Sequence, residues 1–499
     1  MKSLKKILLL GLFLPTFSLV AQNSNVLLDR AFWKSNPDVE TVKNKIKEGN
    51  DPVALNTNAF DAVVYALLEK ADDRVITYLL SLEGNSVDKN THDSRIYLHW
   101  AAYAGKIEMV DYLLEKGSSV TDLDSHGYTP LAFAANSGQK KPELYNTFEK
   151  HGVVLTEEKS DNGANLLLLV AAALNNEKEL NFFLNKGFQL DSKDQSGNGI
   201  FNYAAKKGNT QFLDLLISKG VDYKTPNKEG ANAFLFAAQG GRGFSNPISV
   251  YEYLKNLGLN PNMVTKDGYT PLHRLAYNNK DKVIFDLFLA AGADVNQKDI
   301  NGNTPFINAA ARNNIEMVKL LSTDVSNFNA KNNEGQTPLM LALENNTPEV
   351  VEYLLSKGAD ATLSDNSGNS MAYYWAASYN AKNIAAFEEK RKMLENKDVV
   401  FDTAQADGNT LYHLAAKNNN VSLAKKLDGL GINVNAKNAE GLTPLHLAAM
   451  KAEDDKLMKY LISKGADINI KTDFEETVYD LASENELLQQ QNIVLTFLK

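Results

Sequence analysis

The chain has 499 residues, more than the roughly 250–300 that one hydrophobic core supports, so it predicts several domains or one extended repeat array. With 44% hydrophobic and 23% charged residues, it is neither wholly disordered nor a multi-spanning membrane chain, and its net charge of −9 gives no global field that attracts nucleic acid. The lack of cysteine excludes disulfides, thiolate metal sites, a cysteine nucleophile and lipid attachment through cysteine.

The first 21 residues have the layout of a secretory signal peptide. Lys2, Lys5 and Lys6 precede an apolar stretch over 7–19, and Ala21 offers a small residue for cleavage. The stretch is shorter than the ~20 residues that span a bilayer, which favours cleavage over an N-terminal membrane anchor. We expect an exported mature chain without membrane insertion, stabilised by packing alone.

A 33-residue period runs through the rest of the chain. Glycines in similar contexts recur at spacings of 33 to 40 residues, most often 33. They are Gly127, Gly163, Gly197, Gly230, Gly268, Gly302, Gly335, Gly368, Gly408 and Gly441. We count about twelve units over 57–472, flanked by degenerate capping segments at 22–56 and 473–499.

Each unit predicts a first helix that is short and rich in alanine. Threonine caps such a helix and proline suits its first turn. Five Thr-Pro pairs share this position, beginning at Thr129, Thr270, Thr304, Thr337 and Thr443. The helix is expected to end at a residue that tolerates the left-handed conformation. These residues are Gly105, Gly138, Gly208, Asn279, Asn313, Asn346 and Asn419.

A second helix follows in each unit, with apolar residues at helical spacing. An example is the run Val350, Val351, Leu354 and Leu355. This helix stops at another glycine, for which we expect a left-handed backbone conformation. The glycines at this position include Gly292, Gly358 and Gly465.

Several strings of the chain resemble ankyrin repeats. They are Asp267-Gly-Tyr-Thr-Pro-Leu-His273, Gly292-Ala-Asp-Val-Asn296 and Glu440-Gly-Leu-Thr-Pro-Leu-His-Leu-Ala-Ala449. The resemblance covers nearly the whole mature chain and is most specific over 266–472. It implies an all-α solenoid of helix-turn-helix units with β-hairpin-like loops along one edge, and a scaffold that binds proteins.

The histidines do not form a recognisable catalytic or metal motif. Four share one position in the first helix, His99, His273, His413 and His446, and are interpreted as scaffold residues that bridge adjacent units by hydrogen bonds. The others are scattered, at His92, His126 and His151. His-Glu-x-x-His, Gly-x-Ser-x-Gly and phosphate-loop motifs are absent from the sequence. The sequence therefore predicts no catalytic residue, cofactor or metal.

Aromatic residues on first helices and loop tips are the candidate partner contacts, because Tyr and Trp are over-represented at interface hot spots. They are Trp100, Tyr103, Tyr128 and Tyr269, with Tyr373, Tyr374 and Tyr379 in a divergent unit from residue 366. In that unit Trp375 replaces the usual alanine, which favours a space-filling role over a recognition patch.

Two further features bear on a partner. An insertion at 239–247 is interpreted as a tolerated loop, with a binding loop that uses Arg242 and Phe244 as the alternative. Acidic loop residues such as Asp267 and Glu334 favour a basic partner surface.

These features favour a non-enzymatic, exported scaffold for a protein partner. Because lipidation is excluded and the repeats continue to Lys499, we expect the periplasm of a Gram-negative cell, or secretion. An alternative is a regulator, inhibitor or immunity-type partner of a specific periplasmic enzyme, for example in peroxide defence. A hydrolase with its site in an irregular unit is a third hypothesis.

Overall fold

The computed structural model describes residues 25–241 and 243–499, so the expected signal peptide lies outside the described residues. The expected all-α fold is confirmed: within the described part the chain forms 28 α-helices and five short 3-10 helices, with isolated β-bridges in place of strands. The chain divides into two bodies, Met1–Ile200 and Phe201–Lys499.

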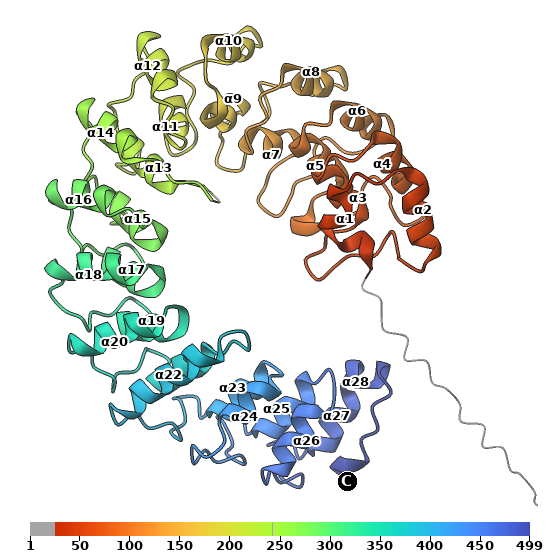
Figure 1. Cartoon of the computed structure of the whole chain (residues 1–499), viewed down its shortest axis with the longest axis vertical. Helices are drawn as coiled ribbons and strands as arrows, with labels where there is room; N and C mark the ends of the chain where they lie inside the picture. The colour runs from red at the N-terminus through yellow and green to blue at the C-terminus, as the bar shows by residue number, and fades with distance from the viewer. Residues whose placement is uncertain (1–24, 242) are drawn as a thin grey trace, which may run out of the picture. The chain divides into compact units, whose positions relative to one another are not determined.

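Helices occur in pairs, which we call repeats, with the odd-numbered helix as the first helix and the even-numbered one as the second (Figure 1). The N-terminal body holds α1 (Arg30–Lys34), α2 (Val39–Lys47), α3 (Ala62–Leu68), α4 (Asp73–Leu80), α5 (Tyr97–Ala104), α6 (Ile107–Glu115), α7 (Pro130–Asn136), α8 (Pro142–Lys150), α9 (Leu166–Val170) and α10 (Glu177–Asn185).

The C-terminal body continues the pattern from α11, whose first residue stands at the boundary. Its helices are α11 (Ile200–Ala205), α12 (Thr210–Ser218), α13 (Ala233–Gln239), α14 (Ile248–Asn256), α15 (Pro271–Asn278), α16 (Lys282–Ala290), α17 (Pro305–Arg312), α18 (Ile315–Leu321), α19 (Pro338–Asn345), α20 (Pro348–Ser356), α21 (Met371–Ala377), α22 (Ile384–Glu395), α23 (Leu411–Lys417), α24 (Val421–Lys426), α25 (Pro444–Lys451), α26 (Lys456–Ser463), α27 (Val478–Glu484) and α28 (Glu486–Gln490).

Within each body the first helices pack in one layer and the second helices in another. In the C-terminal body α15, α17 and α19 contact one another in sequence, and Figure 1 shows α16, α18 and α20 beside them in the second layer. The small, fully buried alanines of the first helices, such as Ala309 and Ala310, permit this close approach. The core therefore lies between the layers and between neighbouring repeats.

The threonines of the Thr-Pro pairs are the N-caps of their first helices. In each case the hydroxyl oxygen accepts the backbone N–H three residues further on, and proline occupies the first turn. Such a cap contributes about 1 kcal/mol of helix stability. The capping residues are Thr129, Thr270, Thr304, Thr337 and Thr443.

The expected left-handed backbone occurs at the ends of the second helices but at only some ends of the first helices. The glycines that end second helices have left-handed backbones, with φ of 88° at Gly292, 86° at Gly358 and 93° at Gly465. At the ends of first helices, left-handed backbones occur at Gly105, Gly138, Gly208 and Asn419.

The left-handed conformation expected at three asparagines is wrong, because Asn279, Asn313 and Asn346 have extended backbones. Their side chains explain the difference at two of them. The Asn313 amide donates to the Ala276 and Asn279 carbonyl oxygens at 2.9 and 2.8 Å. Asn346 makes the equivalent pair of bonds one repeat later. These asparagines satisfy the carbonyls at the end of the preceding first helix, so their polar side chain is needed rather than their tolerance of positive φ.

A buried lysine takes over this bond in the divergent repeat. Lys390 of α22 is 5% exposed, and its Nζ donates at 2.7 Å to the carbonyl of Leu343, which occupies the same helix position as Ala276. Burial lowers the pKa of the Lys390 ammonium to about 8. The ammonium lies at the C-terminal end of α19, where the helix dipole favours a cation.

We expect the pH dependence of stability to reveal this lysine. The folded pKa lies below the unfolded value, so the unfolded chain binds more protons between pH ~8 and ~10.4. The unfolding free energy of the native chain relative to Lys390→Met should therefore rise across that window, by about 1–3 kcal/mol. Denaturant titrations of both chains measure it, with Lys392→Met, an exposed lysine in α22, as control. A constant difference across the window would contradict the burial of a charged lysine.

Four buried histidines join neighbouring repeats through carbonyl oxygens. The Nε2 contacts are His99–Tyr128 at 3.1 Å, His273–Asn303 at 3.2 Å, His413–Leu442 at 3.0 Å and His446–Ile470 at 2.9 Å. Burial lowers the pKa of all four, which favours neutral imidazoles. At His273 the Nδ1 accepts the Thr270 N–H at 3.1 Å, so Nε2 is the donor. His99 lacks this partner because Ile96 replaces the threonine, and its buried Nδ1 has no hydrogen bond.

This difference predicts unequal costs of removing the two imidazoles. His273→Ala should destabilise its repeat by about 1–2 kcal/mol more than His99→Ala, because only the former leaves a buried threonine N–H without its acceptor. Native-state hydrogen exchange of the amides in each repeat measures both losses. Equal losses at the two positions would show that the threonine bond contributes nothing.

Candidate protein-binding surfaces

One side of the first-helix layer carries a repeating row of side chains. Each first helix contributes two residues to the row. The first directly follows the position that His99, His273, His413 and His446 share, and the second lies three residues after the first. In the N-terminal body the first of these positions holds Tyr65, Trp100, Phe133 and Leu169. In the C-terminal body it holds Tyr203, Phe236, Arg274, Asn308, Leu341, Tyr374, Leu414 and Leu447. Most of these side chains are partly exposed, so the row is where the first helices meet solvent.

An aromatic cluster forms this row in the N-terminal body. Tyr103 is 40% exposed and stacks on Phe133, with ring centroids 5.5 Å apart and planes at 21°. Trp100 stands edge-on to both rings, and its Nε1 donates to the Thr91 hydroxyl at 2.8 Å. Because Trp100 is only 5% exposed, its predicted role as a partner contact is corrected: it supports Tyr103, which is the exposed member.

A buried arginine holds this aromatic cluster in place. The Arg95 guanidinium lies 4.1 Å from the ring centroid of Phe133 and 5.2 Å from that of Trp100. Its Nε donates to Asp124 and its Nη1 to Asp93, at 2.8 and 2.9 Å. A paired guanidinium between two rings restricts their movement, so the exposed aromatic surface is preorganised.

Two histidines that look scattered in the sequence meet at the adjacent loop tips. The Nε2 atoms of His92 and His126 each lie 3.4 Å from the same Asp93 carboxylate oxygen. Asp93 and Ser94 both have φ of 57°, an uncommon conformation for residues other than glycine. The signal was present in the sequence, because His92 and His126 are 34 residues apart, about one period.

The two predicted loop-tip tyrosines are half-buried. Burial raises the pKa of both Tyr128 and Tyr269. Tyr269 stacks on His273 with centroids 5.1 Å apart, and the Arg274 guanidinium lies 5.5 Å from its ring centroid. Each tyrosine therefore keeps part of its surface for a partner.

The divergent repeat buries most of its aromatic residues. Trp375 is fully buried, stacks on Phe387 at 4.3 Å and donates from Nε1 to the Phe387 carbonyl at 2.9 Å. Tyr374 is 3% exposed and its hydroxyl donates to Asp365 at 2.6 Å, so its predicted role as a partner contact is wrong. Tyr373 and Tyr379 are half-exposed and keep surface for a partner.

The inserted loop at 239–247 is tied to the first-helix layer at one end. Asn246 is buried and donates to the carbonyl oxygens of Lys206 and Ala237, at 3.2 and 2.9 Å. Phe244 is 42% exposed, whereas Arg242 lies outside the described residues. The loop thus presents an aromatic ring from an anchored base, and its role in binding stays a prediction.

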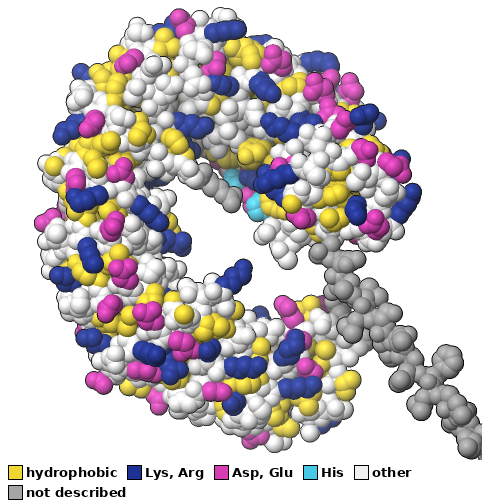
Figure 2. Space-filling view, viewed as in Figure 1, with side chains coloured by type: hydrophobic (Ala, Val, Ile, Leu, Met, Phe, Trp, Pro, Cys, Tyr) yellow, Lys and Arg dark blue, Asp and Glu magenta, His cyan; other side chains and the backbone are white. Residues whose placement is uncertain are grey.

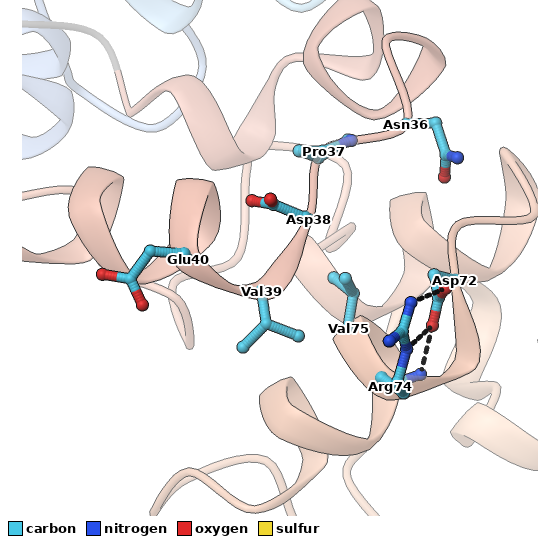
Figure 3. A pocket seen from close by; sticks show the side chains of 8 residues that line it. All are labelled: Asn36, Pro37, Asp38, Val39, Glu40, Asp72, Arg74 and Val75. Atoms are coloured by element: carbon cyan, nitrogen blue, oxygen red, sulfur yellow. Dashed lines mark hydrogen bonds and ion pairs between the residues drawn. The ribbon is translucent and has the colours of Figure 1, made fainter.

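A groove of about 410 Å³ in the N-terminal body lies between the starts of α2 and α4 (Figure 3). Asp38 and Asp72 cap these helices, and Arg74 donates from Nη2 to Asp72 at 2.7 Å. Hydrogen bonds from Arg74 lower the pKa of Asp72 to about 2, and a bond from Thr41 lowers that of Asp38. Because the chain's own carboxylates satisfy both helix starts and Arg74, the groove is a poor site for an anion.

The described residues carry no arrangement that would hold a metal ion: over 25–241 and 243–499, no three His, Asp or Glu side chains come together in that way. In the same part of the chain, no helix is both long enough and apolar enough to cross a membrane.

Comparison with known families identifies the repeats. The family described as "Ankyrin repeats (3 copies)" matches residues 37–143, 201–299, 243–332, 272–365, 324–387 and 375–472. That described as "Ankyrin repeats (many copies)" matches 168–217. The chain belongs to the ankyrin repeat family. Within the matched ranges, the odd- and even-numbered helices are thus the two helices of successive ankyrin repeats, and the loop tips are their connections.

Several curated proteins are similar to parts of this ankyrin-repeat protein. The Fowlpox virus protein FPV031, named as an ankyrin repeat protein, is 36% identical over 84 residues, 17% of this chain and 25% of its own length. Human transient receptor potential cation channel subfamily A member 1 is 26% identical over 188 residues, 37% of this chain and 14% of its own. Alpha-latrocrustotoxin-Lt1a of Latrodectus tredecimguttatus is 51% identical over 53 residues, 11% of this chain and 4% of its own. The chain spans a quarter or less of each relative.

Proposed function

We propose that this ankyrin-repeat protein is an exported, non-enzymatic scaffold that binds a protein partner through its first-helix layer. The observation that carries the proposal is the preorganised aromatic cluster of the N-terminal body. Tyr103 is exposed there, and buried Arg95 and Trp100 fix the ring beneath it. Rigid aromatic side chains supply contact area at a low entropic cost, which suits them to protein interfaces.

The export part of the proposal rests on the sequence of residues 1–21. A basic start, an apolar stretch and a small residue at position 21 are typical of a cleaved signal peptide. Fractionation of the native cells, with N-terminal sequencing of the recovered chain, tests it. A chain that begins near Gln22 outside the cytoplasm agrees with the proposal, and an uncleaved cytoplasmic chain contradicts it.

Affinity capture with matched variants tests the binding part. Tyr103→Ala removes the exposed ring, while Tyr112→Ala removes a half-buried ring from second helix α6 of the same repeat. Partners retained by the native chain and by Tyr112→Ala but lost with Tyr103→Ala would support binding through the first-helix layer. A captured exported enzyme whose activity falls on binding would identify the scaffold as its regulator or inhibitor.

A further inference from the structure

The C-terminal body carries a group of cations on its first-helix layer. Lys206 and Lys207 directly follow α11, Arg274 lies in α15, and Arg312 ends α17. We call these four residues the cationic face. Figure 2 shows Lys and Arg side chains exposed along the first-helix side of α15 and α17. These helices belong to one layer, in which α13 (Ala233–Gln239) stands between α11 and α15, so the four residues lie along one side of the body.

The carboxylates of the chain itself do not neutralise the cationic face. In the described part of the C-terminal body none of the four cations forms an ion pair, whereas Lys282, Lys426 and Lys464 pair with carboxylates. The Nε of Arg274 is buried without a hydrogen-bond partner. Lys206 has its pKa lowered by burial and then by repulsion from Arg274 and Lys207. The cationic face is thus a local concentration of unpaired positive charge in a chain whose net charge is −9.

Aromatic rings lie between these cations. The Arg312 guanidinium is 5.1 Å from the ring centroid of Tyr277, which is 43% exposed, and Arg274 contacts the ring of Tyr269. Tyr203 and Phe236 pack against each other in the two preceding repeats, with centroids 5.5 Å apart. Each of the two arginines thus lies against a ring that also offers apolar contact area.

The cationic face has a defined end. The row positions over α11, α13, α15 and α17 hold no acidic residue, and the first acid in the row is Glu344 of α19. Beyond it, Glu344, Asp365 and Asp407 surround Tyr373, and their charges, after burial, raise its pKa. Glu344 of α19 therefore bounds the cationic face.

We infer that the cationic face binds an extended acidic segment of a protein partner, in which carboxylates alternate with apolar side chains. This inference rests on the proposed scaffold function and names the chemistry of its partner. Arginine binds carboxylates in a bidentate manner, and the rings between the arginines accept the apolar side chains. An extended segment is required because the cations belong to three repeats. The adjacent acids and the net negative charge disfavour a nucleic acid, whose affinity depends on many phosphate contacts.

Fluorescence anisotropy of the full mature chain tests the inference, with a labelled peptide in which Glu residues are interspersed with Leu. We expect salt-sensitive binding that weakens about fivefold or more in the double variant Arg274→Gln/Arg312→Gln. Lys282→Gln removes an exposed cation from second helix α16 of the same body and should bind like the native chain. A peptide with Lys in place of Glu should not bind.

Four outcomes would overturn the inference: no binding of the acidic peptide, equal weakening by Lys282→Gln, tighter binding of a single-stranded oligonucleotide, or tight binding of the Lys peptide. Its failure is distinguishable from failure of the scaffold function. A native partner that is lost with Tyr103→Ala but binds Arg274→Gln/Arg312→Gln at full affinity would leave the scaffold intact and reject the acidic segment.

Discussion

Alanine at Gly268 should destabilise the chain far more than alanine at Gly292, although both glycines belong to one repeat and both have positive φ, 72° and 88°. At Gly292 the nearest atom to an added Cβ is the Asn262 side-chain nitrogen at 3.8 Å, so the cost is that of a left-handed backbone, about 1–2 kcal/mol. At Gly268 the Cβ would overlap the Lys298 carbonyl oxygen of the next loop. The added overlap raises the expected cost to about 3–4 kcal/mol.

The reason lies in how successive loops are joined. Several successive loop tips share one backbone hydrogen bond, such as Asn333 N–H to Asn301 at 2.9 Å and Asn366 N–H to Glu334 at 2.9 Å. A methyl group at Gly268 forces two backbones apart, whereas at Gly292 it makes only an ordinary van der Waals contact. Denaturant unfolding of the two variants measures the difference. Equal midpoints would show that adjacent loops are not packed at this distance.

Trp375→Ala should cost about 3–5 kcal/mol of unfolding free energy, the usual loss for a buried large aromatic residue. The indole is fully buried between Phe387 and Phe401, and its N–H satisfies a helix carbonyl. Tyr379→Ala is the matched control, because Tyr379 touches the same Phe387 edge-on at 5.2 Å from a half-exposed position. It should cost about 1 kcal/mol, as is usual for one aromatic pair.

Hydrogen exchange locates the loss. We expect increased exchange in α21 and α22 of Trp375→Ala, spreading to the neighbouring repeats because each repeat is stabilised by the next. A Trp375→Ala chain with native protection in these helices would contradict the space-filling role. A chain that folds normally but loses its partner would instead make Trp375 a recognition residue.

The sequence predicts the helix pairs and their caps well, because a period of 33 residues averages the signal over many copies. Thr270 and Gly292 are assigned from one repeat and reinforced by the others. The errors occur where a side chain has two physical uses. Asparagine tolerates a left-handed backbone and also donates hydrogen bonds, and only the position of the neighbouring helix decides that Asn313 takes the second role.

The candidate surfaces are harder to predict from the sequence for the same reason. Composition identifies Trp100 and Tyr103 as equivalent aromatics, but packing against Arg95 buries the first and exposes the second. Acidic loops suggest a basic partner, whereas the pairing of charges between repeats leaves Arg274 and Arg312 unneutralised on the helix layer. Aligning the repeats by their period would have shown the row of first-helix residues that contains Arg274 and Tyr277. Which cations lack an acid depends on contacts between residues about 33 positions apart.

Site-specific photocrosslinking in the native cell tests the central claim most directly, that the first-helix layer binds a protein partner. A photoreactive phenylalanine replaces Tyr103 or Tyr277, both exposed on first helices, or Tyr112 or Tyr353 on second helices α6 and α20. Binding through the first helices predicts discrete protein adducts from the Tyr103 and Tyr277 positions and none from the other two. Adducts from Tyr112 and Tyr353 alone would place the partner on the second-helix layer and contradict the claim.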